Sequence, residues 1–168
     1  MVGEGIDLVL DEEVFAVILA ISIIASALGI ALTLRPMVSE PFTAIGLLNE
    51  DCRIGEYPKK TVNGSSLRLC IYVANYLGYP AYFKIVYRIA TNRSLPNTTT
   101  PSPKPILVEW RTVLGNEEEK KFPTAVPVYR VGNETRIALV FELWVFDTDK
   151  NLWVYTGRWT HLYIDVEV

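Results

Sequence analysis

Hydrophobic and polar positions follow two different patterns along this chain of 168 residues. Residues 14–34 contain no charge and no proline, and only Ser22, Ser26 and Thr33 interrupt the apolar run. From residue 42 onward, apolar and polar residues alternate in short segments separated by turn residues. The first pattern is typical of a membrane-spanning helix and the second of half-buried strands.

The apolar run is long enough to cross a bilayer. Its 21 residues would form a helix about 30 Å long, which matches the hydrocarbon core of a membrane. A helix buried in a soluble domain would keep a polar stripe, which this segment lacks. A cleaved signal peptide is the alternative, but the preceding residues are acidic where a signal peptide needs Lys or Arg. We therefore predict a cytoplasmic tail (1–13), a transmembrane helix that contacts the lipid bilayer (14–34) and a linker (35–41).

The remaining residues, 42–168, form one predicted extracytoplasmic domain of about seven strands. In the strand with the clearest alternation, 135–147, the core face consists of Ile137, Leu139, Phe141, Leu143 and Val145. Similar alternation marks 66–74 and the segment ending near Ile89, whereas Pro123 and Pro127 restrict 121–129 to an edge. No helical periodicity follows residue 35. The pattern predicts an immunoglobulin-like antiparallel β-sandwich, with a closed barrel as the alternative.

Four Asn-X-Ser/Thr motifs indicate an external location for this domain. They begin at Asn63, Asn92, Asn97 and Asn133, all in predicted turns or in the long Pro-rich loop 91–105. Such motifs accept N-linked glycans on exposed loops of exported proteins. Turn composition alone is the alternative explanation, because Asn, Ser and Thr favour turns. Loop 91–105 is long for a compact domain, so we expect it to be mobile or modified.

The two cysteines agree with an external location. Cys52 lies in a loop and Cys70 on the following strand. A disulfide between them would require an oxidising compartment or a hyperthermophilic organism, and two free thiols are the alternative. Arg35, on the domain side of the helix, opposes this orientation under the positive-inside rule. One Arg is weak evidence, so we predict a single-pass protein of the cell membrane with its C-terminal domain outside.

The composition gives little support for catalysis. The net charge of −3 and the absence of a basic cluster disfavour nucleic-acid binding. His161 is the single histidine and no nucleophile or metal motif accompanies it, while Glu142 and Asp165 are expected on outward strand faces. We therefore predict no catalytic, cofactor-binding or metal-binding residues.

Aromatic residues on outward strand positions predict a contact surface for other membrane or surface proteins. The residues concerned are Tyr72, Tyr82, Trp144, Phe146 and Tyr163. If they share one sheet they form an exposed patch, which usually marks a protein interface. The alternative is that loops of the same domain cover this face. The small residues of the apolar run would also allow close packing against another helix.

Several motifs resemble an archaeal membrane-protein family, domain of unknown function 1616. The family pattern has a leucine pair, a Tyr-Pro, and a strand that ends in Asn and is followed by Gly-X-Pro-X-X-Tyr. In this chain the corresponding residues are Leu47, Leu48, Tyr57, Pro58, Asn75, Gly78 and Pro80, and Phe83 stands where the pattern has its final Tyr. The resemblance implies membrane helices followed by an outward-facing β domain, and it implies no activity. This chain departs from many members by having one predicted membrane helix.

These observations favour a non-enzymatic, membrane-anchored accessory or structural subunit of a membrane or cell-surface assembly. The alternative is a surface adhesion or binding module, or a component of an envelope lattice or filament. An enzyme is a third class, which a cluster of His161 with two carboxylates would support.

Overall fold

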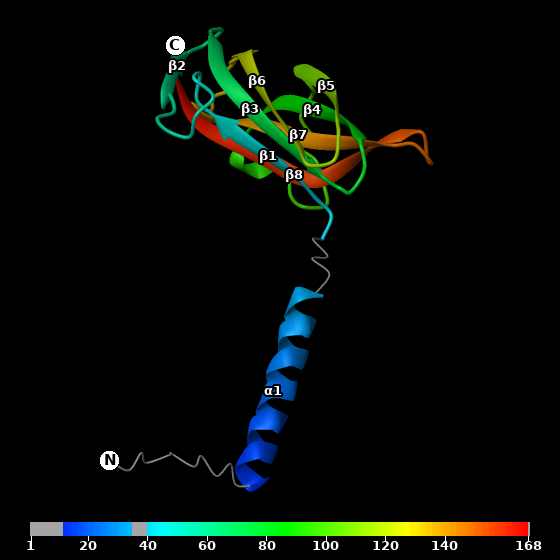
Figure 1. Cartoon of the computed structure of the whole chain (residues 1–168). Helices are drawn as coiled ribbons and strands as arrows, with labels where there is room; N and C mark the ends of the chain where they lie inside the picture. Colours follow the sequence, from blue (N-terminus) through cyan, green and yellow to red (C-terminus); the bar gives the residue numbers. More distant parts are fainter. Residues whose placement is uncertain (1–11, 35–39, 168) are drawn as a thin grey trace, which may run out of the picture. The chain divides into compact units, whose positions relative to one another are not determined.

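The computed structural model describes residues 12–34 and 40–167, which fall into two separate units (Figure 1). The first unit contains helix α1 (Glu12–Thr33) and the second contains the β domain, which begins at Glu40. Most of the predicted tail and of the predicted linker, including Arg35 and Pro36, lies outside the described residues.

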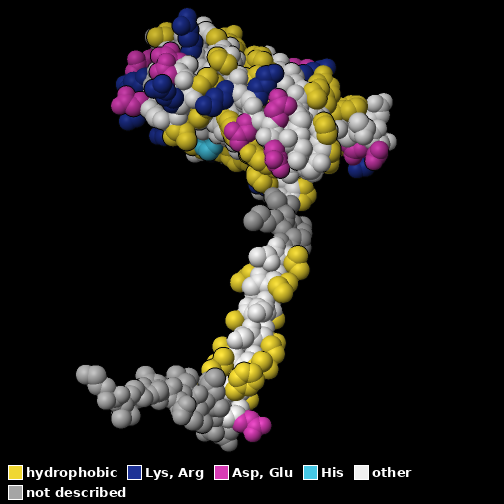
Figure 2. All heavy atoms as spheres, viewed as in Figure 1, with side chains coloured by type: hydrophobic (Ala, Val, Ile, Leu, Met, Phe, Trp, Pro, Cys, Tyr) yellow, Lys and Arg dark blue, Asp and Glu magenta, His cyan; other side chains and the backbone are white. Residues whose placement is uncertain are grey.

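Helix α1 begins two residues before the predicted span and ends one residue before its predicted end. Its polar side chains bond to its own backbone: the Ser22 hydroxyl donates to the Ile18 carbonyl (2.8 Å) and the Ser26 hydroxyl to the Ser22 carbonyl (2.7 Å). Residues 14–33 have a mean hydropathy of 2.7 and are exposed in their own unit. Figure 2 shows apolar side chains along the visible face of this helix, which begins at Glu12. The helix is therefore long and apolar enough to cross a membrane.

The β domain consists of two packed sheets, which confirms the predicted sandwich. The smaller sheet has the order β1-β3-β6 and contains β1 (Phe42–Leu48), β3 (Ser66–Tyr76) and β6 (Glu118–Pro127). The larger sheet has the order β2-β8-β7-β4-β5 and contains β2 (Lys60–Val62), β4 (Ala81–Ala90), β5 (Val108–Leu114), β7 (Arg136–Asp147) and β8 (Leu152–Glu167). A short 3₁₀ helix, η1 (Asn92–Ser94), follows β4. The fold is immunoglobulin-like.

The predicted inward faces of the strands meet between the two sheets. Alternate residues of β3, β4 and β7 form one core that includes Ile71, Phe83 and Phe141, all fully buried. The last strand contributes Ile164 and Val166 to the same core. This agreement follows from the two-residue period of a strand, which places every second side chain on one face.

The structure differs from the sequence prediction in the number and direction of the strands. Residues 40–167 contain eight strands where about seven were predicted, and the three-residue β2 was not among the predicted strands. Strand β2 pairs with β8 in parallel, so the larger sheet is not purely antiparallel. The last two predicted segments form one strand, β8, with a register shift opposite Glu142 and Trp144. Gly157 adopts a positive φ of 73° within the shifted segment, which explains why it looked like a strand break.

Candidate functional site

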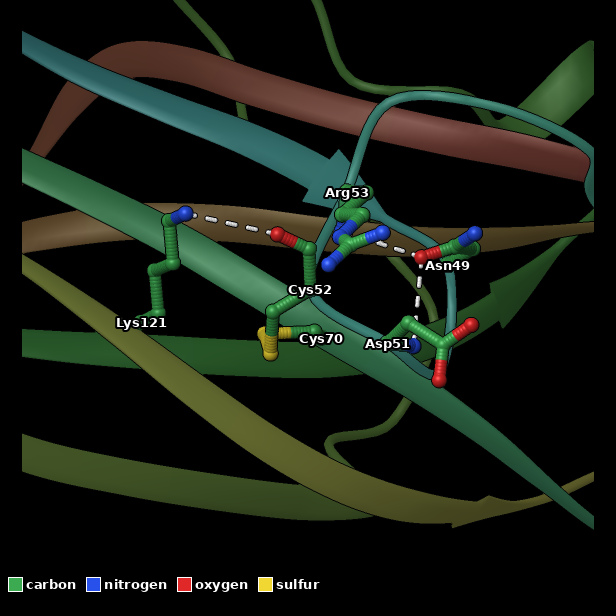
Figure 3. The surroundings of a disulfide bond; sticks show 6 residues. All are labelled: Asn49, Asp51, Cys52, Arg53, Cys70 and Lys121. Atoms are coloured by element: carbon green, nitrogen blue, oxygen red, sulfur yellow. Dashed lines mark hydrogen bonds between the residues drawn. A yellow bond between two sulfur atoms is a disulfide. The ribbon is translucent and has the colours of Figure 1, made fainter.

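A disulfide joins Cys52 to Cys70 and holds the loop after β1 against the smaller sheet (Figure 3). Cys70 is fully buried, although it lies on the face of β3 opposite the core. The Asn49 side-chain oxygen accepts hydrogen bonds from the backbone N–H groups of Asp51 (3.1 Å) and Arg53 (3.0 Å). The ammonium group of Lys121 donates to the Cys52 carbonyl (3.3 Å). The predicted disulfide is confirmed, and the alternative of two free thiols is wrong.

The loop held by this disulfide exposes an apolar side chain beside Tyr72. Ile54 is 88% exposed, and with Leu47 and Tyr72 it lines a cleft of about 570 Å³. Burial, followed by a hydrogen bond with Glu119, raises the pKa of the Tyr72 hydroxyl to about 12. Tyr72 lies half-buried on the outer face of the smaller sheet, and its hydroxyl is neutral at physiological pH.

A separate group of aromatic residues lies on the outer face of the larger sheet, where β4, β7 and β8 meet. We call this group the aromatic patch; it consists of Tyr82, Trp144, Phe146, Trp153 and Tyr155. The Tyr82 ring lies 4.9 Å from that of Trp153 and 6.3 Å from that of Phe146, and the rings of Trp144 and Tyr155 lie 5.4 Å apart. The patch is partly accessible, since Tyr82 is 37% exposed and the other members are half-buried.

A lysine lies among the rings of the aromatic patch. The Lys84 ammonium is 4.7 Å from the centre of the Trp153 ring and 5.3 Å from that of Trp144. Partial burial lowers the pKa of Lys84, although the nearby Glu109 opposes this shift. A cation over an aromatic face is stabilised by the electron-rich ring. The patch therefore combines apolar contact area with a positive charge.

Residues 91–105 cover the other half of the same sheet face, and we call them the strap. The strap was expected to be mobile or modified, but Ser94, Pro96 and Ser102 within it are buried. It lies close to β8 at Gly157, where a Cβ atom would come within 2.3 Å of the Thr98 carbonyl oxygen. The alternative that the domain's own loops cover this face is therefore correct for this half.

A buried ion pair lies beneath the strap. Glu142 is fully buried and accepts hydrogen bonds from Arg88 Nε (3.2 Å), Trp144 Nε1 (3.2 Å) and the backbone N–H of Ser102 (2.6 Å). Arg88 also donates to the Lys104 carbonyl of the strap. Glu142 lies on the outward face of its strand as expected, but the strap covers that face, which the sequence pattern could not show.

The predicted contact residues therefore do not form one patch. Tyr82, Trp144 and Phe146 belong to the aromatic patch, whereas Tyr72 lies on the other sheet. Tyr163 packs against the buried residues below the strap, and its hydroxyl donates to the Asn92 side chain. Trp153 and Tyr155, which were not among the predicted contact residues, share the outer face with Trp144 through the β7–β8 register. Their alternation along β8 was the signal that could have identified them.

The surroundings of His161 contain aromatic rings. The Trp159 ring lies 5.1 Å from the imidazole and the Tyr163 ring 4.8 Å from it. Burial lowers the pKa of His161. Within residues 12–34 and 40–167 no group of three His, Cys, Asp or Glu side chains is placed to hold a metal ion. The expectation of a non-enzymatic protein stays a prediction.

All four Asn residues of the glycosylation motifs are exposed. The Asn97 side-chain oxygen accepts hydrogen bonds from the Thr99 hydroxyl (2.9 Å) and from the backbone N–H groups of Thr99 and Thr100. The Asn63 oxygen accepts from the backbone N–H of Arg130 (3.0 Å). Exposure is compatible with glycans at all four residues, and their glycosylation stays a prediction.

The chain matches no family model and no curated protein. Its structure is similar to the CARDB domain of a Pyrococcus furiosus protein in solution, with a TM-score of 0.47 and 13% identity over 75% of this chain and 94% of that domain. The crystal structure of a CARDB domain from the same organism in complex with di-metal ions has a TM-score of 0.44 and 12% identity, covering 76% of this chain and 89% of that one. A β-glucosidase from Listeria innocua matches with a TM-score of 0.44 and 11% identity over 77% of this chain and 16% of the enzyme. These similarities concern the fold alone, and the resemblance to the archaeal family of unknown function stays a prediction.

Proposed function

We propose that this protein is a single-pass membrane protein whose immunoglobulin-like domain faces outward and serves as an accessory or structural subunit of a membrane or cell-surface assembly. The proposal rests mainly on α1. Twelve large apolar side chains on or next to this helix, from Val14 to Leu34, are between 49% and 73% exposed in their own unit. Each such side chain gains about 1.5–3 kcal/mol on leaving water, so a bilayer or a partner helix must cover them.

Two features of the β domain support an external location. The Cys52–Cys70 disulfide is of the kind that persists in oxidising compartments. The four exposed Asn residues of the glycosylation motifs are positioned where a glycan would not disturb the core. The resemblance to archaeal membrane proteins with outward-facing β domains is consistent with both.

The aromatic patch supports a role in protein contacts. Tyr and Trp side chains provide large contact areas at low entropic cost and dominate the binding energy of many interfaces. Phe146 and Tyr82 also line a cleft of about 520 Å³ beside the β7–β8 turn. A partner side chain that enters this cleft would bury both rings.

The orientation can be tested with protease added to intact cells. We expect the β domain to be cleaved or shed without lysis, and glycosidase-sensitive mass to be present on it. A β domain that is protected in intact cells, unglycosylated, and cleaved only after lysis would show that it faces the cytoplasm.

The role as a subunit can be tested by purifying the full chain from native membranes in mild detergent. Stoichiometric integral-membrane partners, identified by mass spectrometry, would support an accessory subunit. Recovery of the chain alone would contradict it, and recovery in repeating self-assemblies would favour the lattice or filament alternative. Tyr82→Ser should reduce partner recovery, whereas Tyr129→Ser, which removes a ring of similar exposure (48%) elsewhere, should not.

A further inference from the structure

Strand β1 is an edge of the smaller sheet that lacks the features that normally prevent an edge from pairing with another chain. Its seven residues, FTAIGLL, include no charge and no proline. It pairs with β3 on one side only. Exposed edges with free N–H and C=O groups add further strands unless they are short, charged, bulged or interrupted by proline.

The other edges of the sandwich have such protection. Strand β6, at the opposite edge of the same sheet, carries four charged residues (118–121) and the prolines 123 and 127. Strand β5 carries Glu109 and Arg111, and β2 is only three residues long. The stretch of β8 that β2 leaves unpaired has a register shift and the exposed Arg158. The contrast singles out β1.

The free edge of β1 borders a groove at its first half, where Thr43 is 7% exposed and Ile45 is half-buried, and it is closed at its end. A groove of about 420 Å³ lies along it, with residues 42–45 on one side and 157–159 of β8 on the other. Figure 1 shows β1 and β8 running side by side here. Near the end of the strand, the Tyr57 hydroxyl donates to the Leu47 carbonyl (2.7 Å) and occupies that edge position. Among the described residues, no side chain or loop backbone group forms a hydrogen bond with the backbone of Thr43 or Ile45 on this free edge.

The Leu47–Tyr57 contact fixes which backbone groups are free. Residues of an antiparallel strand direct their N–H and C=O groups alternately to either side. Because the Leu47 carbonyl points away from β3, those of Thr43 and Ile45 do so as well. The segment available for pairing is therefore short and is centred on Ala44.

We propose that the free edge of β1 pairs with β1 of a second copy of this chain, antiparallel and about a two-fold axis at Ala44. Thr43 of each copy then lies opposite Ile45 of the other, and each of these two pairs exchanges both backbone hydrogen bonds. An uncharged strand brings no like charges together when it meets its own copy, and Ala44 and Gly46 leave room on the outer face. The arrangement joins two three-stranded sheets into one of six strands. It does not depend on the orientation in the membrane or on the aromatic patch.

The register predicts one specific cross-link in the full chain. In this register Ala44 faces Ala44 as a non-hydrogen-bonded pair with Cα atoms about 4.5 Å apart, a separation that a disulfide can bridge. The two Gly46 residues are four positions out of register, about 14 Å apart, which a disulfide cannot bridge. Gly46→Cys is a matched control, because a Cβ at this position meets Tyr72 only at an ordinary contact of 3.5 Å.

We expect mild oxidation of membranes containing the Ala44→Cys chain to give a covalent dimer, and the Gly46→Cys chain to remain monomeric. Equal cross-linking of the two variants, or none of Ala44→Cys, would overturn the proposal. As an independent test, Ala44→Lys places two ammonium groups at the axis and should weaken dimerisation by about tenfold or more. A wild-type chain that is monomeric by light scattering in detergent, or a folded Ala44→Lys chain that dimerises as well as wild type, would also overturn it.

Discussion

Replacing Gly157 with Ala tests whether the strap lies on β8. The backbone at Gly157 has a φ of 73°, which costs a residue with a Cβ about 1–2 kcal/mol. The new Cβ would also lie 2.3 Å from the Thr98 carbonyl oxygen, which is a backbone atom and cannot rotate away. The tip of the strap must therefore move, and the hydrogen bond from the Tyr155 hydroxyl to the Asn97 carbonyl (2.9 Å) is lost. At about 1 kcal/mol for this bond, the total loss of stability is about 2–3 kcal/mol.

Gly78→Ala is the matched control for this prediction. Gly78 also has a positive φ, of 88°, but no atom lies within 4 Å of its would-be Cβ. We expect it to lose only the backbone contribution of about 1–2 kcal/mol. Thermal unfolding followed by Trp fluorescence measures the difference, and limited proteolysis reports whether residues 91–105 become cleavable in Gly157→Ala. Equal stability losses and equal proteolysis of the two variants would refute the close contact between the strap and β8.

Three further predictions concern groups that the fold brings together. Glu142→Ala should lower the free energy of unfolding by about 3–5 kcal/mol, because it leaves the largely buried Arg88 without its negatively charged partner. Denaturant unfolding measures this change, and a loss below about 1 kcal/mol would contradict the reasoning. Replacing both Cys52 and Cys70 with Ser should cost about 3 kcal/mol through the entropy of the opened loop, measured in the same way. Because burial lowers the folded-state pKa of His161, the unfolding free energy should fall as pH drops below the ordinary value of 6.5 and through the folded-state pKa. His161→Gln should flatten that pH dependence, and an unchanged profile would count against it.

The sequence predicted strand faces better than it predicted strand number. Alternation in β7 correctly placed Phe141 and its neighbours in the core, because burial of one face requires a period of two. It missed β2, whose three residues are too few to show a period. It also divided β8 at Gly157, because a glycine within a register shift has the same local signature as a turn.

The candidate contact surface was predicted in part. The outward position of Trp144 and Phe146 followed from the period of β7. That Tyr72 lies on the other sheet depends on strand order, which alternation within a strand does not encode. Glu142 and Tyr163 were also placed on the outer face, but the polar composition of the strap gave no sign that this segment would cover them.

Local sequence patterns were enough to predict the apolar helix, the inward faces of the long strands and a bond between the two cysteines. These features depend on neighbours within a few positions, or on there being only two cysteines to pair. Three features became visible only in the folded domain: which outer faces stay accessible, where Arg88 and Glu142 meet, and that β1 is the edge without protection. Those features depend on contacts between segments far apart in the chain, such as Ser102 with Glu142, whose free energy exists only once both sheets have formed.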